Sequence, residues 1–442
     1  MRRVSAVLLV TSCVVAVAAF SANGARSGQP AGPPQASAAA ACPAPDTSIS
    51  LPTGFCASIF ADHVGDPRHL VVAPNGDVFT TLEFRRLRSA PGSDTATALV
   101  ALRDVNHDGV SDSLVRVRGH GGTGVALYNG YLYIDEAQQL VRYKLHAGDL
   151  EPTGDAEVVV EGIPIAGDHN ARNFLIDKRG NLYLNIGTAT NACQAQNRVL
   201  HSLGADPCKE LDTRGGIWKF DANALHQKPT LANRFATGVR NAEGMQFDPR
   251  DGSLWTTQHG RDQLHDNWPE LFTVDYQGDN PGEELIHVHQ GDDFGWPYCY
   301  YSMVEHHLVL APEYGGDGTR TGRCAEKKEP VAAFPGHWAP MSLLFYTGKM
   351  LPAKYTHGAF IAFHGSWNRA PLPQAGYNVV FQPLVNGAAS GAYEVFANGF
   401  GGATPAPGKA AHRPAGLAQG PDGALYVTDD AHGRIWRIVY DR

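Results

Sequence analysis

Three polar clusters in this chain of 442 residues hold the side-chain types that acid–base and anion chemistry require. Asp168-His169 precedes a short apolar run, Arg240-Asn241 precedes another, and the polar run 257–262 (Thr-Gln-His-Gly-Arg-Asp) adds a second histidine. An imidazole can take up a proton, a guanidinium can stabilise an anion, and an amide can anchor a ligand. If the clusters face one cavity, we expect His169 as a base, Arg240 as an anion stabiliser and Asn241 as an anchor. The alternative is that they are structural loop residues bonded to backbone carbonyls.

The segment 104–112 has the composition of a cation-binding loop. Oxygen-bearing side chains occupy alternate positions and Gly109 stands sixth, where a tight turn is needed to wrap Ca²⁺. The twelfth position is Val115 rather than Glu, and no helical pattern flanks the loop, so it is not an EF-hand. We interpret it as a stabilising calcium site, with an ordinary Asx-rich turn as the alternative. The predicted ligands are Asp104, Asn106, Asp108 and Asp112.

An internal repeat indicates which elements position these clusters. The stretch 168–188 reads as two short strands joined by a turn at 178–181, and the same layout recurs. The six units lie at 68–81, 124–134, 168–188, 240–257, 342–363 and 414–428. Four of them are followed by a further alternating run, so each unit supplies about four strands. Four-stranded sheets repeated radially form a β-propeller. We therefore predict an all-β, six-bladed β-propeller rather than a barrel or a sandwich.

The ends of the domain are expected to meet in the last blade. The strand at 54–61 would pair with the run 434–440 and close the ring, which removes unpaired sheet edges. The loops that precede the inner strands converge on a central channel. The repeat therefore predicts that His169, Arg240 and the run 257–262 meet there.

The composition limits the classes of function. The net charge is −8, with 18% charged residues and no basic stripe, which argues against a nucleic-acid partner. Glycine (49) and proline (29) interrupt the chain too often for long helices. The length alone suggests two or three domains, but the blades of a propeller form one ring.

The first residues are typical of an export signal. Arg2-Arg3 is followed by the apolar run 4–20, which is short for a membrane span, and by small residues near Ala22 and Ala25. We predict a signal peptide over 1–25, a Pro/Ala/Ser-rich linker over 26–41 and the propeller over 42–442. The mature protein is expected in the periplasm or outside the cell, without a stable membrane span.

The cysteines agree with export. Removal of the leader takes Cys13 and leaves six cysteines, and an even number in an exported chain indicates disulfides. Closing loops of this size contributes roughly 3 kcal/mol each in the chain-entropy model. The pairs suggested by proximity in the sequence are Cys42–Cys56, Cys193–Cys208 and Cys299–Cys324.

Several motifs, taken in order, resemble the glucose/sorbosone dehydrogenase family. They are His169 with Arg172-Asn173, then the segments 238–244 (GVRNAEG), 294–297 (FGWP), 345–348 (FYTG), 364–369 (HGSWNR) and 422–430 (DGALYVTDD). The resemblance runs from about Leu51 to the C-terminus and is closer to the sorbosone-dehydrogenase-like branch. Members of this family are soluble six-bladed propellers that use pyrroloquinoline quinone (PQQ).

The resemblance implies a function and its catalytic residues. The chain would oxidise an aldose or a related sugar aldehyde, and hydride would pass to the quinone while a histidine takes the hydroxyl proton. His169 matches that histidine, and Arg240-Asn241 match the pair that holds the quinone oxygens. An external electron acceptor would complete the cycle. The expected oligomeric state is a monomer or a homodimer.

The resemblance also implies a cofactor site made of PQQ and Ca²⁺. Main-chain carbonyls of Gly260 and Arg261 match the family's catalytic calcium ligands. Arg369 would pair with cofactor carboxylates, and Trp338 would stack on the cofactor. We assign Gln258 and His259, next to the calcium loop, to the same cofactor-binding set.

Two positions depart from the family and keep alternatives open. Thr188 stands where a carboxylate orients the catalytic histidine, with Asp168 as a possible substitute, and Thr347 stands where a lysine meets the cofactor. One alternative is a calcium-dependent lactonase or esterase that uses Glu243, Asn241 and Asp262. The other is a ligand-binding propeller without chemistry.

Overall fold

The computed structural model describes residues 42, 44–83, 97–406 and 408–441, which all belong to one compact unit. The predicted leader and linker, residues 1–41, and Cys13 lie outside the described residues. Within the part that the structure describes, no helix is long and apolar enough to cross a membrane.

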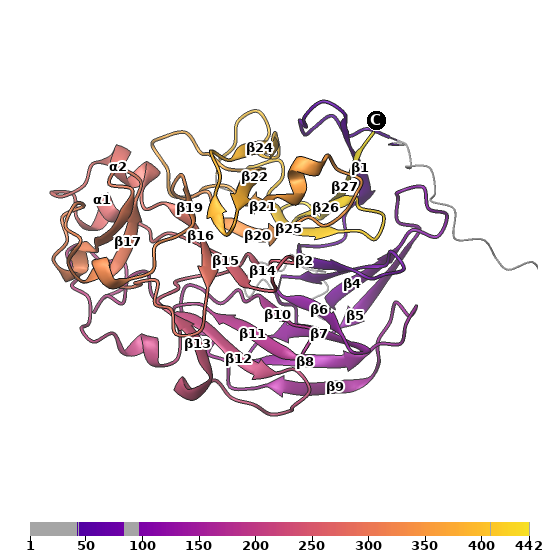
Figure 1. Cartoon of the computed structure of the whole chain (residues 1–442), viewed down its shortest axis with the longest axis horizontal. Helices are drawn as coiled ribbons and strands as arrows, with labels where there is room; N and C mark the ends of the chain where they lie inside the picture. The colour runs from indigo at the N-terminus through magenta and orange to yellow at the C-terminus, as the bar shows by residue number, and fades with distance from the viewer. Residues whose placement is uncertain (1–41, 43, 84–96, 407, 442) are drawn as a thin grey trace, which may run out of the picture. The chain divides into compact units, whose positions relative to one another are not determined.

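Six antiparallel sheets surround a common centre, which confirms the predicted six-bladed propeller (Figure 1). The first three blades run in chain order from the inner to the outer strand. Blade 1 contains β2 (Pro67–Val72), β3 (Val78–Leu82), β4 (Thr97–Arg103) and β5 (Ser113–Arg118). Blade 2 contains β6 (Val125–Tyr128), β7 (Tyr131–Glu136), β8 (Gln139–Lys144) and β9 (Thr153–Val160). Blade 3 contains β10 (Phe174–Ile176), β11 (Asn181–Ile186), β12 (Gly216–Asp221) and β13 (Arg234–Thr237).

The remaining blades follow the same order, except that the last one ends on the first strand of the chain. Blade 4 contains β14 (Met245–Phe247), β15 (Leu254–Gln258), β16 (Glu283–Val288) and β19 (Ala332–Phe334). Blade 5 contains β20 (Pro340–Leu344), β21 (Gly358–Phe363), β22 (Asn378–Val385) and β24 (Glu394–Ala397), with the short β23 (Ala388–Ala389) paired to β22. Blade 6 contains β25 (Pro414–Gln419), β26 (Leu425–Asp429), β27 (Arg434–Tyr440) and β1 (Phe55–Ala61).

The ring closes as predicted. β1 pairs antiparallel with β27, from Phe55 opposite Tyr440 to Ala61 opposite Ile435. The disulfide Cys42–Cys56 ties the preceding segment to this closing strand. The last blade is thus assembled from both ends of the described chain. The pairing of β1 with β27 covers an edge of β27 that would otherwise be unpaired.

Most strands are buried on both faces, because each blade packs between two others. In β11, Leu182, Leu184 and Ile186 face the core shared with blade 2, whereas Tyr183 faces the core shared with blade 4. Alternation of side chains across a strand produces this division. The result is a strand that reads as a nearly continuous buried run.

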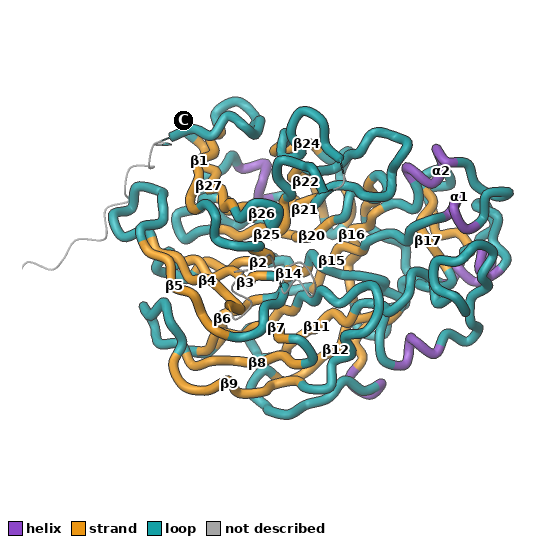
Figure 2. The backbone as a smooth tube through the Cα atoms, turned by 180° about the vertical axis from the view of Figure 1, so that it is seen from behind, coloured by secondary structure: helices purple, strands orange, loops and turns teal. Residues whose placement is uncertain are grey.

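An insertion in blade 4 interrupts the repeat. It has two parts, with α1 (Leu264–Asn267) and α2 (Val274–Asp279) before β16, and β17 (Cys299–Ser302) and β18 (His307–Leu310) after it. In Figures 1 and 2 it lies at the edge of the ring, opposite β4 and β5. The predicted disulfides Cys193–Cys208 and Cys299–Cys324 are also confirmed, and the first packs with Trp296 in a small core beneath this region.

Threonine hydroxyls join adjacent blades along the inner rim. Thr81, near the end of β3, donates to the carbonyl of Thr123 at 2.7 Å, and Thr428 in β26 donates to the carbonyl of Arg68 at 2.7 Å. Space is scarce there, since a Cβ on Gly416 would lie 2.4 Å from the same Arg68 carbonyl. Crowding of the inner strands therefore explains why small and hydroxylated residues recur at equivalent places in the repeat.

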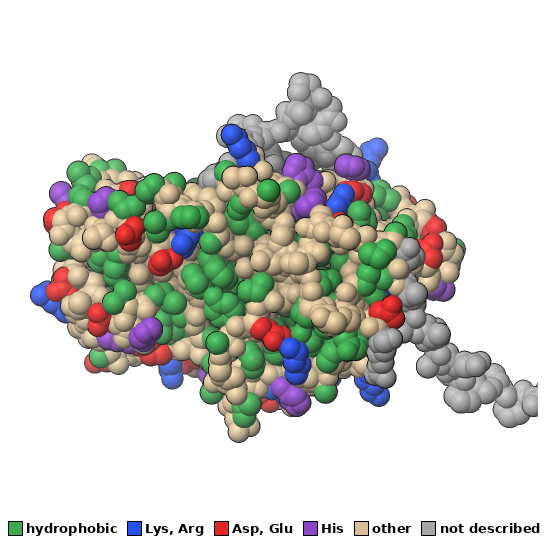
Figure 3. Space-filling view, turned by 90° about the horizontal axis from the view of Figure 1, so that it is seen from above, with side chains coloured by type: hydrophobic (Ala, Val, Ile, Leu, Met, Phe, Trp, Pro, Cys, Tyr) green, Lys and Arg blue, Asp and Glu red, His purple; other side chains and the backbone are tan. Residues whose placement is uncertain are grey.

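Surface charge is distributed without a dominant sign on the face shown in Figure 3, where acidic and basic side chains are interspersed.

A buried ion network connects blades 1, 4 and 6. The guanidinium of Arg68 donates to Asp430 at 2.6 Å and to Glu243 at 2.8 Å, and all three side chains are at most 6% exposed. Burial alone would raise the pKa of Glu243, but the charge of Arg68 lowers it below its usual value. Both carboxylates are therefore charged and depend on Arg68.

Removing Arg68 should destabilise the protein in a pH-dependent way. Arg68→Met removes the guanidinium shared by two buried carboxylates, and we expect a loss of about 3–5 kcal/mol in the free energy of urea unfolding at pH 7.5. The loss should shrink toward pH 5, because carboxylates whose folded-state pKa is raised regain stability as they become protonated. The exposed pair Lys354–Glu394 provides a control, and Lys354→Met should cost about 0–1 kcal/mol. Equal, pH-independent losses in the two variants would contradict the assignment.

Candidate active site

The predicted clusters meet in a cavity of about 200 Å³. His169 comes from the loop before blade 3, Arg240 from the loop before blade 4, and Asp262 from the start of the insertion. The cavity is also lined by His259, Glu283, His337, Trp367 and Asn368. The structure therefore brings together residues that lie nearly 200 positions apart.

The tautomer of His169 follows from its partners. Nδ1 lies 3.0 Å from the carbonyl oxygen of Thr188 and 2.9 Å from its Oγ1. That hydroxyl donates its own hydrogen to the carbonyl of Thr190 at 2.9 Å, so it can only accept from His169. Nδ1 must then carry the proton, and Nε2 keeps its lone pair. Thr188 thus orients the imidazole as a base without a carboxylate.

Asp168 does not replace the carboxylate that the family has at position 188. Its Oδ2 accepts from Arg198 Nε at 2.8 Å and from Asn197 at 3.1 Å, and it does not line the cavity. Because Thr188 supplies both acceptors to Nδ1, the neighbouring carboxylate is free to hold the disulfide-closed loop 193–208.

Burial and charge keep His169 neutral. Burial is the largest influence that lowers the pKa of His169 well below its usual value, and the positive charge of Arg240 lowers it further. The negative charge of Asp262 opposes both effects. At neutral pH the side chain is therefore an unprotonated base beside a cation.

Asp262 is the electrostatic centre of the cavity. It accepts from Arg240 at 2.9 Å, from Arg198 at 3.1 Å and from Asn368 at 2.8 Å, and it lies 3.4 Å from His337 Nδ1. Burial would raise the pKa of Asp262, but the adjacent guanidinium of Arg240 holds it well below its usual value. The sequence placed Asp262 in the polar run 257–262 that was predicted to reach the channel and in the alternative lactonase site, but it gave Asp262 no role beside His169 and Arg240, because its partners come from four distant segments.

Arg240 is almost fully engaged by the protein. Four of its five N–H groups donate to the Asn191 carbonyl, the Asn191 side chain, the Gly260 carbonyl and Asp262, at 2.8–3.2 Å. Its guanidinium is therefore held in one orientation. Among the described residues no acceptor is assigned to the fifth N–H, on Nη1, which remains for a ligand.

Two further ionisable groups line the cavity. Burial alone would lower the pKa of His337, but its interaction with Asp262 raises it, which favours a cationic imidazole. Burial raises the pKa of Glu283, whose oxygens accept from the backbone N–H groups of Gly260 and Ala339. The cavity thus combines a neutral base with the guanidinium of Arg240 and with a second imidazole, that of His337, whose pKa is raised by Asp262.

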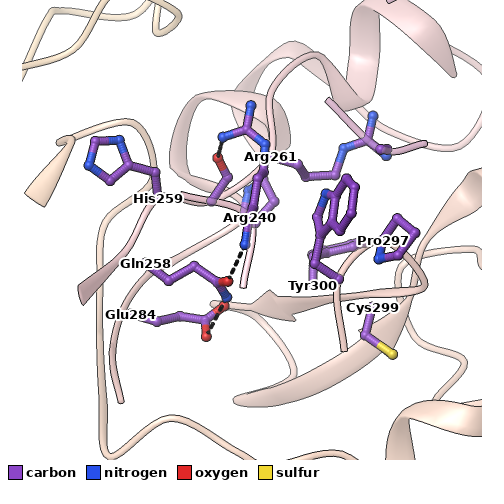
Figure 4. A pocket seen from close by; sticks show the side chains of 12 residues that line it. Arg240, Gln258, His259, Arg261, Glu284, Pro297, Cys299 and Tyr300 are labelled. Carbon is purple, nitrogen blue, oxygen red and sulfur yellow. Dashed lines mark hydrogen bonds between the residues drawn. The ribbon is translucent and has the colours of Figure 1, made fainter. Parts of the chain in front are cut away.

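A smaller cavity of about 10 Å³, enough for one water molecule, lies behind Arg240. Gln258 lines this cavity. Its Oε1 accepts from the Arg240 backbone N–H at 2.8 Å, and its Nε2 donates to Glu284 at 3.0 Å (Figure 4). Burial raises the pKa of Glu284 to about 8. Both ends of Gln258 are therefore used within the protein, and its role here is to support Arg240.

Not every predicted site residue faces the larger cavity. Trp338 packs edge-on against Phe363 and Tyr393, and Arg369 donates to the carbonyl of Gly278 and to Asp279. The aromatic side chain at the cavity is instead Trp367, which is 50% exposed. Trp367 stood within the predicted motif, and only its exposure distinguishes it from Trp338.

Of three further residues that the sequence analysis singled out, His259 lines the cavity, whereas Asn241 and Thr347 do not. His259 lines the cavity, with Nε2 3.0 Å from the Pro340 carbonyl. Asn241 is buried, donates to Glu243 at 3.2 Å, and has no partner for its Oδ1. Thr347 follows β20, whereas Ala339, which lines the cavity, precedes it. The departure at Thr347 therefore lies at the opposite end of blade 5 from the cavity.

The described residues contain no group of three or more His, Cys, Asp or Glu arranged to hold a metal ion. In the loop 104–112, Asp104 accepts from Gly109, Asp108 from Val110 and Asp112 from Val105. The backbone thus satisfies these carboxylates as in an Asx-rich turn. The calcium site at Asp104, Asn106, Asp108 and Asp112 stays a prediction. Calcium at the carbonyls of Gly260 and Arg261 also stays a prediction, and the Gly260 carbonyl already accepts a hydrogen bond from Arg240.

Fold and cavity together define a closed six-bladed propeller with a neutral imidazole, a guanidinium and an exposed indole at one cavity. The TrAA12-like family matches residues 49–441, and the chain belongs to this family. The resemblance expected from the motifs is thereby confirmed.

Two curated relatives illustrate the similarity. The chain is 26% identical over 394 residues to a pyrroloquinoline quinone-dependent pyranose dehydrogenase of Coprinopsis cinerea, covering 76% of this chain and 52% of that protein. It is 21% identical to an uncharacterised protein of Borreliella burgdorferi, covering 90% and 92% of the two chains. The chain thus spans about half the length of the curated pyranose dehydrogenase.

Solved structures share the fold. A Trichoderma reesei carbohydrate-active enzyme of family AA12 superposes with a TM-score of 0.71 at 19% identity, covering 89% of this chain and 97% of that one. The holo form of the pyranose dehydrogenase PQQ domain from Coprinopsis cinerea superposes with a TM-score of 0.69 at 17% identity, covering 88% and 97%.

The role of Asp262 can be tested without any assumption about function. Asp262→Asn removes the counter-charge of Arg240 and Arg198, and we expect a loss of about 3 kcal/mol in stability. The pKa of His169, followed by ¹⁵N NMR of the imidazole, should fall further, because Asp262 is what opposes its depression.

Asp168→Asn is the matched control, since it removes another carboxylate partner of Arg198 outside the cavity. This variant should leave the pKa of His169 unchanged. A shift as large as that in Asp262→Asn would overturn the electrostatic role assigned to Asp262.

Proposed function

We propose that the chain oxidises an aldose or a related sugar aldehyde, with PQQ as its cofactor. The observation that carries this proposal is the orientation of His169, whose Nδ1–H is bound by Thr188 and whose neutral Nε2 lies at a cavity shared with Arg240. The TrAA12-like family and the PQQ-dependent relative support it.

The residues at the cavity fit a flat, anionic cofactor. Arg240 and His337 supply positive charge, and Trp367 offers an indole face that is stacked from the protein side by Arg413, 4.8 Å from the ring centroid. Charge-assisted hydrogen bonds of this kind hold carboxylates. PQQ, when bound, supplies a quinone that accepts hydride. Arg240, His259, His337, Trp367 and Asn368 would hold it, with Trp338 and Arg369 in the layer behind.

The protein's own part in the reaction is proton transfer and charge stabilisation. Nε2 of His169 would take the proton from the sugar hydroxyl, because burial and Arg240 keep this imidazole neutral. As it becomes an imidazolium, Asp262 would stabilise it. The remaining N–H of Arg240 would stabilise negative charge on the sugar oxygen or the cofactor.

Other properties belong to the same proposal. Ca²⁺ would bind beside the cofactor at the carbonyls of Gly260 and Arg261, and an external acceptor would remove the electrons. Disulfides favour an exported protein, with residues 1–25 as signal peptide and 26–41 as linker.

The lactonase alternative is less well supported. Its carboxylate, Glu243, is paired with Arg68 at 2.8 Å and with Asn241 at 3.2 Å. An anion already neutralised by an arginine is a poor calcium ligand. Hydrolysis of a sugar lactone without added PQQ would nevertheless restore this alternative.

Reconstitution with PQQ and Ca²⁺ tests the proposal directly. We expect a visible spectrum that changes when an aldose is added. His169→Gln should bind PQQ as the wild type does and lose about 10²–10⁴-fold in kcat, the usual contribution of a general base. The exposed His226 provides the control, and His226→Gln should keep full activity. Unchanged turnover in His169→Gln would contradict the assignment of His169 as the base.

The pH dependence provides a separate test. Since the base must be unprotonated and the pKa of His169 lies well below 6.5, kcat/KM should be flat from pH 7 to 8 and fall only on the acid side of 6.5. Asp262→Asn should move the acid limb to still lower pH. An acid limb centred at or above pH 7 would contradict His169 as the base.

A further inference from the structure

A second cavity of about 240 Å³ lies beside the candidate active site. Its lining includes Thr123 and Asp135 of blade 2, Ile165, and the segment Asn170–Arg172. This segment directly follows His169, which lines the first cavity. The two cavities therefore flank one short stretch of backbone, residues 169–172.

Arg172 is a buried side chain with unused donors in this cavity. It is 3% exposed, and Nη2 donates to the carbonyl of Ala137, which holds the guanidinium in place. Among the residues that the structure describes, Nε and Nη1 of Arg172 have no hydrogen-bond partner. Buried N–H groups without an acceptor are rare and costly, so their presence at a cavity wall points to an acceptor supplied from outside the protein.

Asp135 faces the same guanidinium but does not satisfy it. Oδ1 is occupied by the backbone N–H groups of Thr123 and Gly124, both at 2.7 Å. Oδ2 lies 3.6 Å from Arg172 Nε, close enough to balance its charge and too far for a hydrogen bond. The pair is thus nearly neutral and lacks a group that accepts from Arg172 and donates to Asp135.

A hydroxyl group has this dual character, whereas an anion would only accept. An anion would also meet two carboxylates of the lining, Glu83 and Asp135, and Asp135, which is 2% exposed, can neutralise the guanidinium itself. Asn170 adds an acceptor, since its Oδ1 is buried and has no partner within the described part of the chain. The lining thus suits a neutral compound with several hydroxyl groups.

We propose that this cavity is a subsite for the sugar ring linked to the one oxidised at His169, so that the preferred substrate is a disaccharide or longer saccharide. The proposal rests on the proposed function for the first ring only. Arg172 and Asp135 hold adjacent hydroxyls of the second ring, and the segment 169–172 sets the spacing between the two rings.

Binding by calorimetry tests the subsite independently of turnover. The full chain, with and without PQQ, is titrated with glucose and with maltose, cellobiose and lactose. At least one disaccharide should bind about tenfold more tightly than glucose, the gain expected from hydrogen bonds to charged groups. Arg172→Lys keeps the charge but loses the planar fork, and should remove this gain while leaving glucose binding unchanged.

Two further variants separate recognition from folding. Asp135→Asn should also weaken disaccharide binding selectively. The control is Arg142→Lys, a buried arginine of the same blade that pairs with Glu157 at 2.7 Å outside the cavity and should change neither affinity. Circular dichroism on each variant checks that the fold is retained, and the comparison of sugars in the unmodified protein decides the matter if a variant unfolds.

The outcomes distinguish the two proposals. The subsite would be overturned if disaccharides bind no better than glucose. It would also be overturned if Arg172→Lys weakens the binding of glucose and of disaccharides equally, and in either case the occupant of the cavity would be water. Selective disaccharide binding without PQQ-dependent oxidation would keep the subsite and remove the dehydrogenase.

Discussion

Closure of the ring by β1 and β27 is the constraint on which the rest of the structure depends. It joins residues from opposite ends of the described chain, with Phe55 opposite Tyr440, and it holds the inner strands of all blades around one centre. Crowding there excludes a side chain at Gly416 and favours hydroxyls such as that of Thr428, which bond to the next blade. It also removes charged groups from water, and these groups must then neutralise one another.

Three buried arginines, Arg68, Arg240 and Arg172, each have a carboxylate partner, and the differences between the pairs correspond to different roles. Arg68 donates directly to Glu243 and Asp430 and so connects three blades. Arg240 donates to Asp262 but retains one N–H at the cavity, so it is rigid and still able to bind a ligand. Arg172 is balanced by Asp135 without a hydrogen bond between them, which leaves two of its nitrogens unpartnered. All three arginines are thus balanced in charge, whereas Arg240 and Arg172 also keep unused hydrogen-bonding capacity at a cavity wall.

The candidate site shows how a base can be oriented without the carboxylate expected at position 188. Thr188 uses its hydroxyl hydrogen on Thr190, so both of its oxygens accept from His169 and fix the tautomer. The negative charge that stabilises a protonated histidine comes instead from Asp262, at the start of the blade 4 insertion. Orientation and charge compensation are supplied by two residues here, and each can be changed without the other.

The sequence by itself determined the number of blades, the closing strand, the disulfide pairs and the meeting of His169 with Arg240, because turn residues and alternating strands are local signals and the repeat makes their positions equivalent. The tertiary structure decided that Trp367 rather than Trp338 faces the cavity, that Asp168 turns toward Arg198, and that Asp262 collects partners from four segments. It also decided that Arg172 lacks acceptors at a second cavity. These features depend on side-chain direction and on which loops close over the channel, and neither is encoded in the spacing of residues along the chain.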